Sequence, residues 1–366
     1  MISDIWLLLS TILLIFLLCG LSLIYSGVSR AKNAMMPLVG LFLLMPLVFI
    51  IWYSGGSLLI YGANLDLEVS SKLFMLFNCF FACISIYLVW GAVLERMKNK
   101  ALILFSLLWV IFVYIPVAYH LVGANGFFQA LGIIDFAGGF TVHMTSGVSA
   151  LVLALCVGRR LDYFNLKNKF NQSHIFLGTI FVWVGWIGFN GGSSLILNEM
   201  GILAAQNTIA APIFSLVTWM LIDYLYTPHK VTLINISLAI VSGLVAITPA
   251  AGLISFWQTA VLGLLAGFIC NFSARLMHKV FKVDDVLDVF STHAVGGILG
   301  AVLAPIFLGL SPIHNIYAIF ATLLYSSIFT FVIIKFVSWI TPLRVEKEVE
   351  EQGLNIEYHA ENIVNL

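Results

Sequence analysis

Eleven long apolar stretches restrict this chain to one environment. They cover residues 4–27, 34–55, 70–93, 100–121, 139–158, 173–193, 201–226, 231–249, 256–280, 287–309 and 313–340. A helix needs about 20 apolar residues to cross the hydrocarbon core of a bilayer. Hydrophobic residues make up 61% of the chain and charged residues only 9%, whereas soluble domains carry about 25% charged residues. The sequence therefore predicts an all-α polytopic membrane protein with eleven transmembrane helices.

Positive charge is distributed unequally between the loops. Of the 17 Lys and Arg residues, 15 follow odd-numbered spans or lie in the tail, namely Arg30, Lys32, Arg96, Lys98, Lys100, Arg159, Arg160, Lys167, Lys169, Lys230, Arg275, Lys279, Lys282, Arg344 and Lys347. Loops after even-numbered spans carry only Lys72. Because Lys and Arg concentrate in cytoplasmic loops, the N-terminus is predicted outside and the C-terminus inside the cell membrane.

The chain divides into a membrane domain and a charged tail. Residues 1–340 form the predicted transmembrane domain, and residues 341–366 contain the stretch LRVEKEVEEQGLNIEYHAENIVNL. This tail is either a solvated helix end or a segment that contacts other subunits or a cytoplasmic regulatory protein, and its charge does not separate the two. The net charge of zero gives no indication of nucleic-acid binding.

Two similar motifs, DFAGGFTVH (135–143) and DVLDVFSTH (285–293), each open with an aspartate and close with a histidine. They lie at the starts of the fifth and tenth spans, so an odd number of crossings separates them. Copies separated in this way enter the membrane from opposite sides, which is typical of an inverted repeat with its site at the midplane. The predicted repeats cover about residues 1–160 and 173–309, and the helix at 313–340 is an addition.

His143 and His293 are predicted to meet where the two repeats face each other. A neutral imidazole has one donor and one acceptor nitrogen, so two rings in contact can share a proton and pass it on. Ionisable groups inside a membrane usually mark a transport path or a proton relay. A single buried histidine would be interpreted as a hydrogen bond to a neighbouring helix, but two at matched positions favour the relay.

The chain is not expected to be an enzyme or to hold a metal or cofactor. Two histidines with nearby aspartates could suggest a metal site, but no further ligand lies on the same helices at a metal-site spacing. The five cysteines lie in apolar segments without a CxxC pair, which is typical of small buried side chains.

Asp135, Asp285 and Asp288 precede the helices that carry the histidines. A carboxylate in this place accepts hydrogen bonds from the free amides of the first turn and is favoured by the helix dipole. All three are therefore predicted to be helix caps. For Asp135 alone, direct contact with a cationic substrate at the outer mouth is a second interpretation.

Aromatic residues gather beside small residues in FNCFFACIS (77–85) and GWIGFNGGSS (185–194). Aromatic side chains of membrane helices face lipid by default, and Phe81, Phe189 and Trp186 could do so. An aromatic lining would equally suit a pore that attracts a small cation and strips its water at a hydrophobic constriction.

The segment DFAGGFTVHMTSGVSALVLALCVGRR (135–160) resembles the signature of the ammonium transporter family, which includes the methylammonium permeases and the Rh proteins. Similar stretches are YSGVSRAKN (25–33), FFACIS (80–85), WGAVLERMK (90–98), GWIGFNGGSS (185–194), ITPAAG (247–252) and VDDVLDVFSTHAVGG (283–297). The tail also resembles the cytoplasmic C-terminus of this family, so the resemblance extends to about residue 358.

The resemblance implies a homotrimer in which each subunit conducts ammonium, with methylammonium as a related substrate, through its own hydrophobic pore. His143 and His293 match the twin histidines at mid-pore. The implied mechanism removes a proton from ammonium at the outer site, after which ammonia crosses the pore and the proton passes through the histidines.

The resemblance also implies the outer site. Phe81 and Phe189 match the two stacked phenylalanines that gate the entrance, and Ser193 matches the hydroxyl of the external ammonium site. Asp135 matches the aspartate beneath that site, so these four residues are the expected substrate-binding set.

One position departs from the family pattern. Members usually carry a tryptophan at the external cation site, in a stretch similar to AHxVWG, whereas this chain reads YHLVGANG (119–126) with Val122 or Gly123 in that place. Phe127 and Phe128 are the candidates to replace it. Loss of the tryptophan would weaken a cation–π contact by about 0.5–2 kcal/mol. A second function therefore stays open: an ammonium sensor of the same fold that signals through its C-terminus or a fused domain, with little or no transport.

Overall fold

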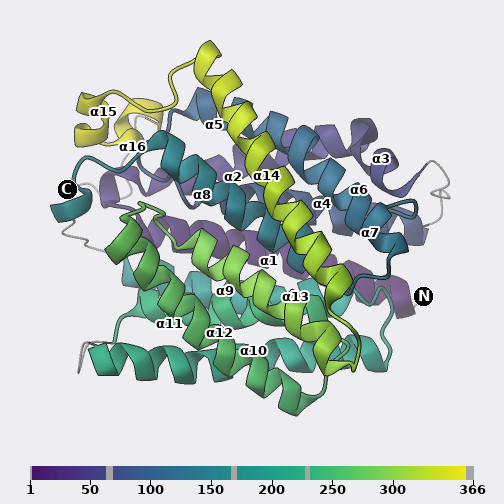
Figure 1. Ribbon diagram of the computed structural model, residues 1–366. Helices are drawn as coiled ribbons and strands as arrows, with labels where there is room; N and C mark the ends of the chain where they lie inside the picture. Colours follow the sequence, from purple (N-terminus) through teal and green to yellow (C-terminus); the bar gives the residue numbers. More distant parts are fainter. Residues whose placement is uncertain (1, 63–68, 166–170, 227–230, 360–366) are drawn as a thin grey trace.

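The computed structural model describes residues 2–62, 69–165, 171–226 and 231–359, which form the helical bundle in Figure 1. Eleven helices in these ranges are long and apolar enough to cross a membrane: Ile2–Val28, Ala31–Tyr61, Ser71–Trp90, Asn99–Ala130, Gly139–Val157, Gln172–Gly192, Glu199–Tyr226, Leu233–Ala250, Phe256–Phe281, Phe290–Phe307 and Ile313–Ile340. Each overlaps one predicted span, and the described residues contain no β-strand, so the all-α membrane fold is confirmed. Lys167, Lys169 and Lys230, three of the cations that predict orientation, lie outside the described residues.

Several of these spans are built from more than one helical segment. The α-helices are α1 (Ile2–Val28), α2 (Met35–Ile51), α3 (Ser57–Tyr61), α4 (Val69–Trp90), α5 (Asn99–Trp109), α6 (Ile115–Val122), α7 (Phe127–Ala130), α8 (Thr145–Val157), α9 (Gln172–Gly192), α10 (Glu199–Tyr226), α11 (Leu233–Ile247), α12 (Phe256–Leu276), α13 (Gly296–Phe307), α14 (Ile313–Ile340), α15 (Lys347–Gln352) and α16 (Leu354–His359). Three short 3₁₀ turns are η1 (Ala31–Asn33), η5 (Tyr163–Asn165) and η6 (Thr248–Ala250). Five π-turns are η2 (Trp52–Gly56), η3 (Val110–Tyr114), η4 (Gly139–Met144), η7 (Met277–Phe281) and η8 (Phe290–Val295). Such π-turns are frequent at functional sites.

Helices α1 and α9 pack closely along the middle of the bundle (Figure 1). A Cβ atom added to Gly20 would lie 2.7 Å from the carbonyl oxygen of Gly178, and one added to Gly178 would lie 2.6 Å from that of Gly20. Small residues let helices approach closely in lipid, where van der Waals packing drives their association. α1 and α9 are the first helices of the two predicted repeats. Gly20 and Gly178 therefore set the distance between the two repeats where these helices cross.

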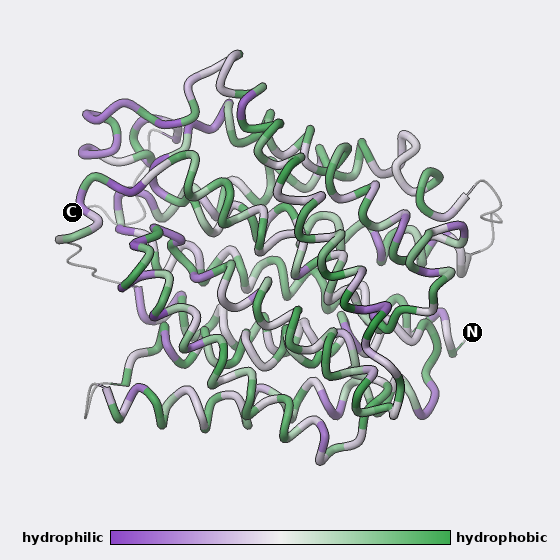
Figure 2. The backbone as a smooth tube through the Cα atoms, in the orientation of Figure 1, coloured by the Kyte–Doolittle hydropathy of each residue, from purple (hydrophilic) through white to green (hydrophobic). Residues whose placement is uncertain are grey.

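The two ends of the bundle differ in charge. The N-terminus lies at the right of Figure 1 and helices α15 and α16 at the left, where hydrophilic residues gather in Figure 2. Ion pairs join distant segments at that end: Arg30 Nε to Glu95 Oε1 (3.0 Å), Arg160 Nη2 to Asp284 Oδ1 (2.8 Å) and Lys98 Nζ to Glu346 Oε1 (2.6 Å). We call this the basic end. Its cations belong to the set predicted to share one side of the membrane, and they lie together.

The described part of the tail packs back onto the basic end. Arg344 Nη2 lies 2.7 Å from Glu350 Oε2, and Glu350 Oε1 accepts a hydrogen bond from the amide of Leu161 (2.8 Å). Asn355 Oδ1 accepts another from the amide of Met35 at 3.0 Å. These contacts reach the start of α2 and the loop after the fifth span, so residues 341–359 do not form a freely solvated helix end.

Candidate functional site

A cavity of about 360 Å³ opens at the end of the bundle opposite the basic end, and we call it the vestibule. Its wall includes Phe81, Ser193 and Asp135, three of the residues expected to contact the substrate. Asn78 and Gln129 add further polar groups. The fourth expected residue, Phe189, lies behind this wall rather than in it.

Two phenylalanine rings close the inner end of the vestibule. The rings of Phe81 and Phe189 stack with their centroids 4.1 Å apart and an interplanar angle of 12°. Phe81 is 7% exposed and Phe189 is fully buried, so neither ring faces lipid. The hydroxyl of Ser193 donates to the carbonyl oxygen of Phe189 at 2.8 Å, which fixes the end of α9 beside the stacked pair. The structure thus brings the expected gate residues together.

The two histidines follow directly behind the gate. The ring centroid of Phe189 is 5.8 Å from that of His143, and the Nδ1 atom of His143 is 3.3 Å from Nδ1 of His293. Both histidines are buried. Trp186 stacks on His143 at 5.1 Å, and its indole N–H donates to Thr248 Oγ1 at 3.0 Å, which restricts the orientation of the imidazole.

The short contact between the imidazoles restricts their protonation. At 3.3 Å one Nδ1 atom donates a hydrogen bond and the other accepts it. Because a neutral imidazole has one N–H, the two rings take opposite tautomers, so one presents a bare Nε2 and the other a protonated Nε2. The Nε2 atom of His143 is buried and has no hydrogen-bond partner within the described ranges. No described group of the protein therefore engages this nitrogen.

Each histidine lies on a π-turn and is followed four residues later by a glycine. His143 lies on η4 and precedes Gly147, while His293 lies on η8 and precedes Gly297. A Cβ atom on Gly147 would lie 2.3 Å from the amide nitrogen of Ala294, and one on Gly297 would lie 3.0 Å from a carbonyl oxygen of η4. The two copies of the motif thus contact each other reciprocally, and glycine permits the approach that joins the rings.

Asp135 caps η4 and also lines the vestibule. Its Oδ1 atom accepts a hydrogen bond from the amide of Gly139 at 2.5 Å, and Oδ2 accepts one from the amide of Phe140 at 3.1 Å. Burial raises the pKa of this carboxyl to about 6, although the amide hydrogen bonds oppose the shift. Both interpretations of Asp135, as a cap and as a residue of the outer site, are compatible with this position.

Asp285 is the counterpart of Asp135 at the basic end. Its Oδ2 atom accepts a hydrogen bond from the amide of Phe290 at 2.8 Å, the first residue of η8. Burial raises the pKa of Asp285 to about 6, and the nearby charge of Asp288 adds to the shift.

Asp288 does not cap η8 with its side chain, contrary to the expectation from sequence. Its carboxylate lies 2.8 Å from Nε2 of His278, and its backbone carbonyl accepts the amide of Thr292. The backbone explains the difference, because an N-cap residue usually has β-region angles, whereas Asp288 has a φ of 51°.

Sequence reasoning missed part of the vestibule wall, including Tyr61, Asn78 and Gln129. The hydroxyl of Tyr61 donates to Asn78 Oδ1 at 2.9 Å. Asn78 is a polar residue within an apolar span, and this is the sequence feature that could have identified it as part of the site. Tyr61 and Gln129 lie on the short helices α3 and α7, which are outside the predicted spans. Nothing periodic in the sequence indicates that these helices reach the vestibule.

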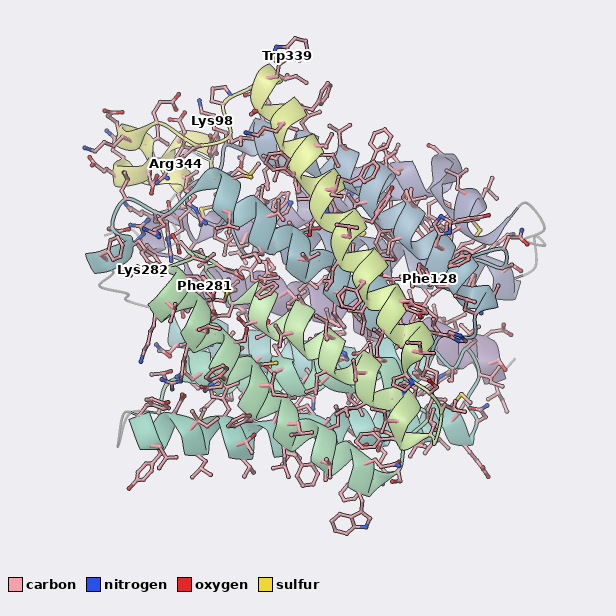
Figure 3. All side chains as sticks on the ribbon, in the orientation of Figure 1. Lys98, Phe128, Phe281, Lys282, Trp339 and Arg344 are labelled. Atoms are coloured by element: carbon pink, nitrogen blue, oxygen red, sulfur yellow. The ribbon has the colours of Figure 1, made fainter. Side chains whose placement is uncertain are left out.

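Val122 lines the vestibule in the stretch where the resemblance leads one to expect a tryptophan. Neither of the two candidates to replace it, Phe127 and Phe128, belongs to the vestibule lining. Phe127 is 61% exposed, and Phe128 lines a separate cavity with residues of α6 and α14. The two rings pack edge to face against each other with their centroids 5.1 Å apart. Figure 3 shows Phe128 beside α14 at the right of the bundle.

The parts of the chain that the structure describes contain no group of three or more His, Cys, Asp or Glu side chains that could hold a metal ion. The cysteines are free thiols. The site therefore consists of aromatic rings, two imidazoles, a carboxylate and a few neutral polar groups.

Known proteins resemble this chain over nearly its whole length, and its residues 5–363 match the Ammonium Transporter Family. An ammonium transporter of Aquifex aeolicus is 36% identical over 99% of this chain and 93% of its own length, and one of Bacillus subtilis is 34% identical over 93% of each. The solved structure of a Sensor Amt Protein superimposes with a TM-score of 0.92 at 25% identity over 98% of both chains. Saccharomyces cerevisiae Mep2 gives 0.84 at 27% identity over 94% of this chain and 90% of its own. The chain therefore belongs to the ammonium transporter family, a family of membrane transporters rather than enzymes.

Proposed function

We propose that this protein transports ammonium across the membrane by moving ammonia and a proton separately. One observation carries the proposal: three features lie one behind the other in space. They are the vestibule, the stacked pair of Phe81 and Phe189, and the contacting pair of His143 and His293. A polar cavity thus leads through an aromatic constriction to groups that can exchange a proton.

Ammonium binds first in the vestibule. The aromatic wall attracts a small cation through the negative faces of its rings, and the hydroxyl of Ser193 offers an acceptor lone pair. The carboxylate of Asp135 adds negative charge beneath the wall, although its oxygens are bonded to backbone amides. Its contribution is therefore electrostatic and structural.

The cation loses its proton before it passes the gate. Moving an unpaired ion into an apolar constriction costs far more free energy than moving a small neutral molecule. The rings of Phe81 and Phe189 stack in contact with their centroids 4.1 Å apart, so a ring must move before any molecule passes this apolar constriction. Ammonia, which is neutral, crosses this barrier at much lower cost.

The proton follows through the two imidazoles. A proton first binds to the bare Nε2 of one ring. That ring then gives its Nδ1 proton to Nδ1 of the second ring. The second ring releases its Nε2 proton on the other side. Both rings end in the opposite tautomer, so they must reset before the next proton passes. The 3.3 Å contact between Nδ1 atoms supports this shared step.

We also propose the arrangement in the membrane. The vestibule faces outside and the basic end faces the cytoplasm, because Lys and Arg concentrate in cytoplasmic loops. Residues 1–160 and 173–309 act as inverted repeats, and three subunits assemble with one pore in each. Residues 341–366 form the cytoplasmic tail, where a regulatory protein would bind.

A second candidate function is ammonium sensing. Two observations favour it: Val122 lines the vestibule in place of the usual tryptophan, and the fold matches a Sensor Amt Protein with a TM-score of 0.92. A sensor would bind ammonium in the vestibule and change the contacts of its tail without moving ions at a useful rate.

Reconstitution separates the two functions. Purified protein in liposomes on a supported membrane receives a step of ammonium chloride, with sodium chloride of equal ionic strength as the control. Transport gives an ammonium-dependent transient current whose decay rate increases with the number of proteins per liposome. Ammonium binding by calorimetry without such a current would reject transport and leave the sensor.

A further inference from the structure

The two copies of the Asp–His motif differ at one position of their backbone. Gly138 and Asp288 occupy the same place, three residues after the first aspartate of each copy, and both are left-handed, with φ of 97° and 51°. The carbonyl oxygen of each accepts the amide four residues later, that of Val142 at 3.0 Å and that of Thr292 at 2.8 Å. This position therefore begins the turn that carries each histidine, but the copy at the basic end fills it with a charged side chain.

Asp288 is held in this conformation at a cost. A left-handed angle costs glycine little, whereas for another residue it shifts a two-state equilibrium by about 5- to 30-fold. Asp288 also acts on Asp285, which caps η8 at the amide of Phe290: burial raises the pKa of Asp285 to about 6, and the charge of Asp288 adds to the shift. Such strain persists only where the surroundings enforce it, so Asp288 needs a partner.

His278 supplies that partner from another helix. Its Nε2 atom lies 2.8 Å from Oδ1 of Asp288, and the two side chains are 39% and 12% exposed. His278 lies on η7, which ends at Phe281 at the left of Figure 3. The hydroxyl of Tyr163 lies 3.5 Å from Nδ1 of the same ring and donates to the carbonyl of Val283 at 3.3 Å. The imidazole is thus held between the end of α12, the turn η5 and the segment before η8.

The charge of His278 opposes the repulsion between the carboxylates, because it acts on the pKa of Asp285 in the opposite sense to Asp288. The neighbouring Asp284 is already neutralised, since it forms two hydrogen bonds with Arg160, at 2.8 and 3.0 Å. Among the described residues, His278 is therefore the group that pairs with Asp288.

This pair acts on the turn that holds His293. Thr292 donates to the carbonyl oxygen of Asp288 through its amide and through its hydroxyl, both at 2.8 Å, and it directly precedes His293. A shift in the backbone of Asp288 would therefore move the ring of His293, whose Nδ1 atom lies 3.3 Å from that of His143. A hydrogen bond weakens steeply when its geometry changes, so this contact is sensitive to such a shift.

We propose that His278 is a positioning residue for the pore histidine His293. It holds Asp288 in the left-handed conformation that begins η8, and so fixes where the second imidazole meets the first. His278 acts through Asp288 and Thr292 rather than on the substrate. The proposal rests on the transport function proposed above and extends it to a side chain at the basic end.

The test uses the purified full chain in liposomes on a supported membrane, with the ammonium concentration varied. The variants are His278→Ala and the pair His278→Ala with Asp288→Gly, because glycine adopts the left-handed angle without a partner, as Gly138 does in the other copy. The matched control is His174→Ala, which removes an imidazole from the first turn of α9. Thermal unfolding checks that each variant folds, and His278→Gln replaces His278→Ala if the latter does not.

A second readout does not depend on transport. Nitrogen NMR of histidine-labelled protein reports the hydrogen bond between the two Nδ1 atoms, and its signals are assigned by their loss in His143→Ala. A wild type without current would reject the transport function, while the NMR signals of the His278 variants would still decide the positioning role.

In His278→Ala the maximal current should fall about fivefold or more, and the Nδ1 signals should shift. The ammonium concentration for a half-maximal response should stay unchanged, because the vestibule lies at the opposite end. Adding Asp288→Gly should restore the current and the signals, and His174→Ala should resemble wild type. Wild-type current and signals in a folded His278→Ala protein, no recovery in the double variant, or an equal loss in His174→Ala would overturn the proposal.

Discussion

The Nδ1 atoms of His143 and His293 lie 3.3 Å apart although the residues are 150 positions apart in the chain. No local interaction brings them together. Their contact depends on the crossing of two similar segments, each with a π-turn and a glycine four residues after the histidine. The proposed function depends on the geometry of this crossing.

Substituting Gly147 should separate the histidines. In Gly147→Ala the new methyl group would lie 2.3 Å from the backbone nitrogen of Ala294, so one helix must move. Overpacking of this kind usually costs about 1–3 kcal/mol. We expect a lower unfolding temperature and a smaller ammonium-dependent current. Gly297→Ala is the milder comparison, because its nearest contact would be 3.0 Å; equal stability of wild type and Gly147→Ala would show that the crossing tolerates a wider spacing.

The charge of Asp135 should give the vestibule a pH dependence. Because its pKa is about 6, ammonium binding should weaken as the pH falls from 7 to 5 and the carboxylate becomes protonated. Calorimetric titration of ammonium at several pH values measures this, and Asp135→Asn should bind weakly with little change over that range. A wild-type affinity that is constant between pH 5 and 7 would contradict the role of this charge.

The same pKa predicts an opposite effect on stability. The pKa of Asp135 is raised on folding from 3.8 to about 6, so its stabilising contribution is complete below pH 3.8 and is lost as the pH rises through 6. Asp135→Asn does not ionise, so its stability relative to wild type should rise over this interval, by at most about 3 kcal/mol. The measurement is the difference in unfolding free energy between variant and wild type from pH 4 to 8.

An aromatic ring in place of Val122 should strengthen ammonium capture. Val122→Trp places an indole at the vestibule wall, where a cation–π contact contributes about 0.5–2 kcal/mol. The ammonium concentration for a half-maximal response should fall by about 2- to 30-fold. Phe127→Trp is the control because Phe127 is exposed outside the vestibule. An unchanged or higher half-maximal concentration in Val122→Trp would place the cation elsewhere.

The buried carboxylate of Glu95 should be essential for folding of the basic end. It lies 2.9 Å from Arg160 Nη1 and 3.0 Å from Arg30 Nε, and its side chain is fully buried. Burial raises the pKa of Glu95, but the two guanidinium groups outweigh burial and hold that pKa below its usual value. Removing one partner of a buried pair costs about 3–5 kcal/mol, so Glu95→Gln should unfold at a much lower temperature than wild type.

The matched control for that variant is Glu346→Gln. Glu346 pairs with Lys98 at 2.6 Å, but its side chain is 61% exposed. An exposed pair contributes about 0–1 kcal/mol, so this variant should unfold close to the wild-type temperature. Similar losses in the two variants would mean that burial does not determine the strength of these pairs.

The membrane fold could be predicted because its main signal is local. Each span is an apolar stretch long enough to cross a bilayer, and no tertiary information is needed to recognise it. The contact between His143 and His293 was also predictable, since the motif occurs twice with an odd number of spans between the copies. Symmetry supplied the long-range information that a single motif lacks.

The remaining features depend on three-dimensional contacts without a sequence pattern. Tyr61 and Gln129 reach the vestibule from short helices that are far apart in the chain. The side chain of Asp288 turns to His278 because of one left-handed backbone angle, which its residue type does not reveal. Phe128 was a reasonable substitute for the tryptophan by distance along the chain, but it packs into another cavity.

The most direct test of the proposed function is the current carried by His143→Ala. Wild type and variant are reconstituted at equal density, their folding is checked by thermal unfolding, and each receives the same ammonium step on a supported membrane. The relay through His143 and His293 predicts a transient in wild type that is largely lost in a folded His143→Ala protein. A folded variant with the wild-type amplitude and decay rate would contradict a proton path through these histidines.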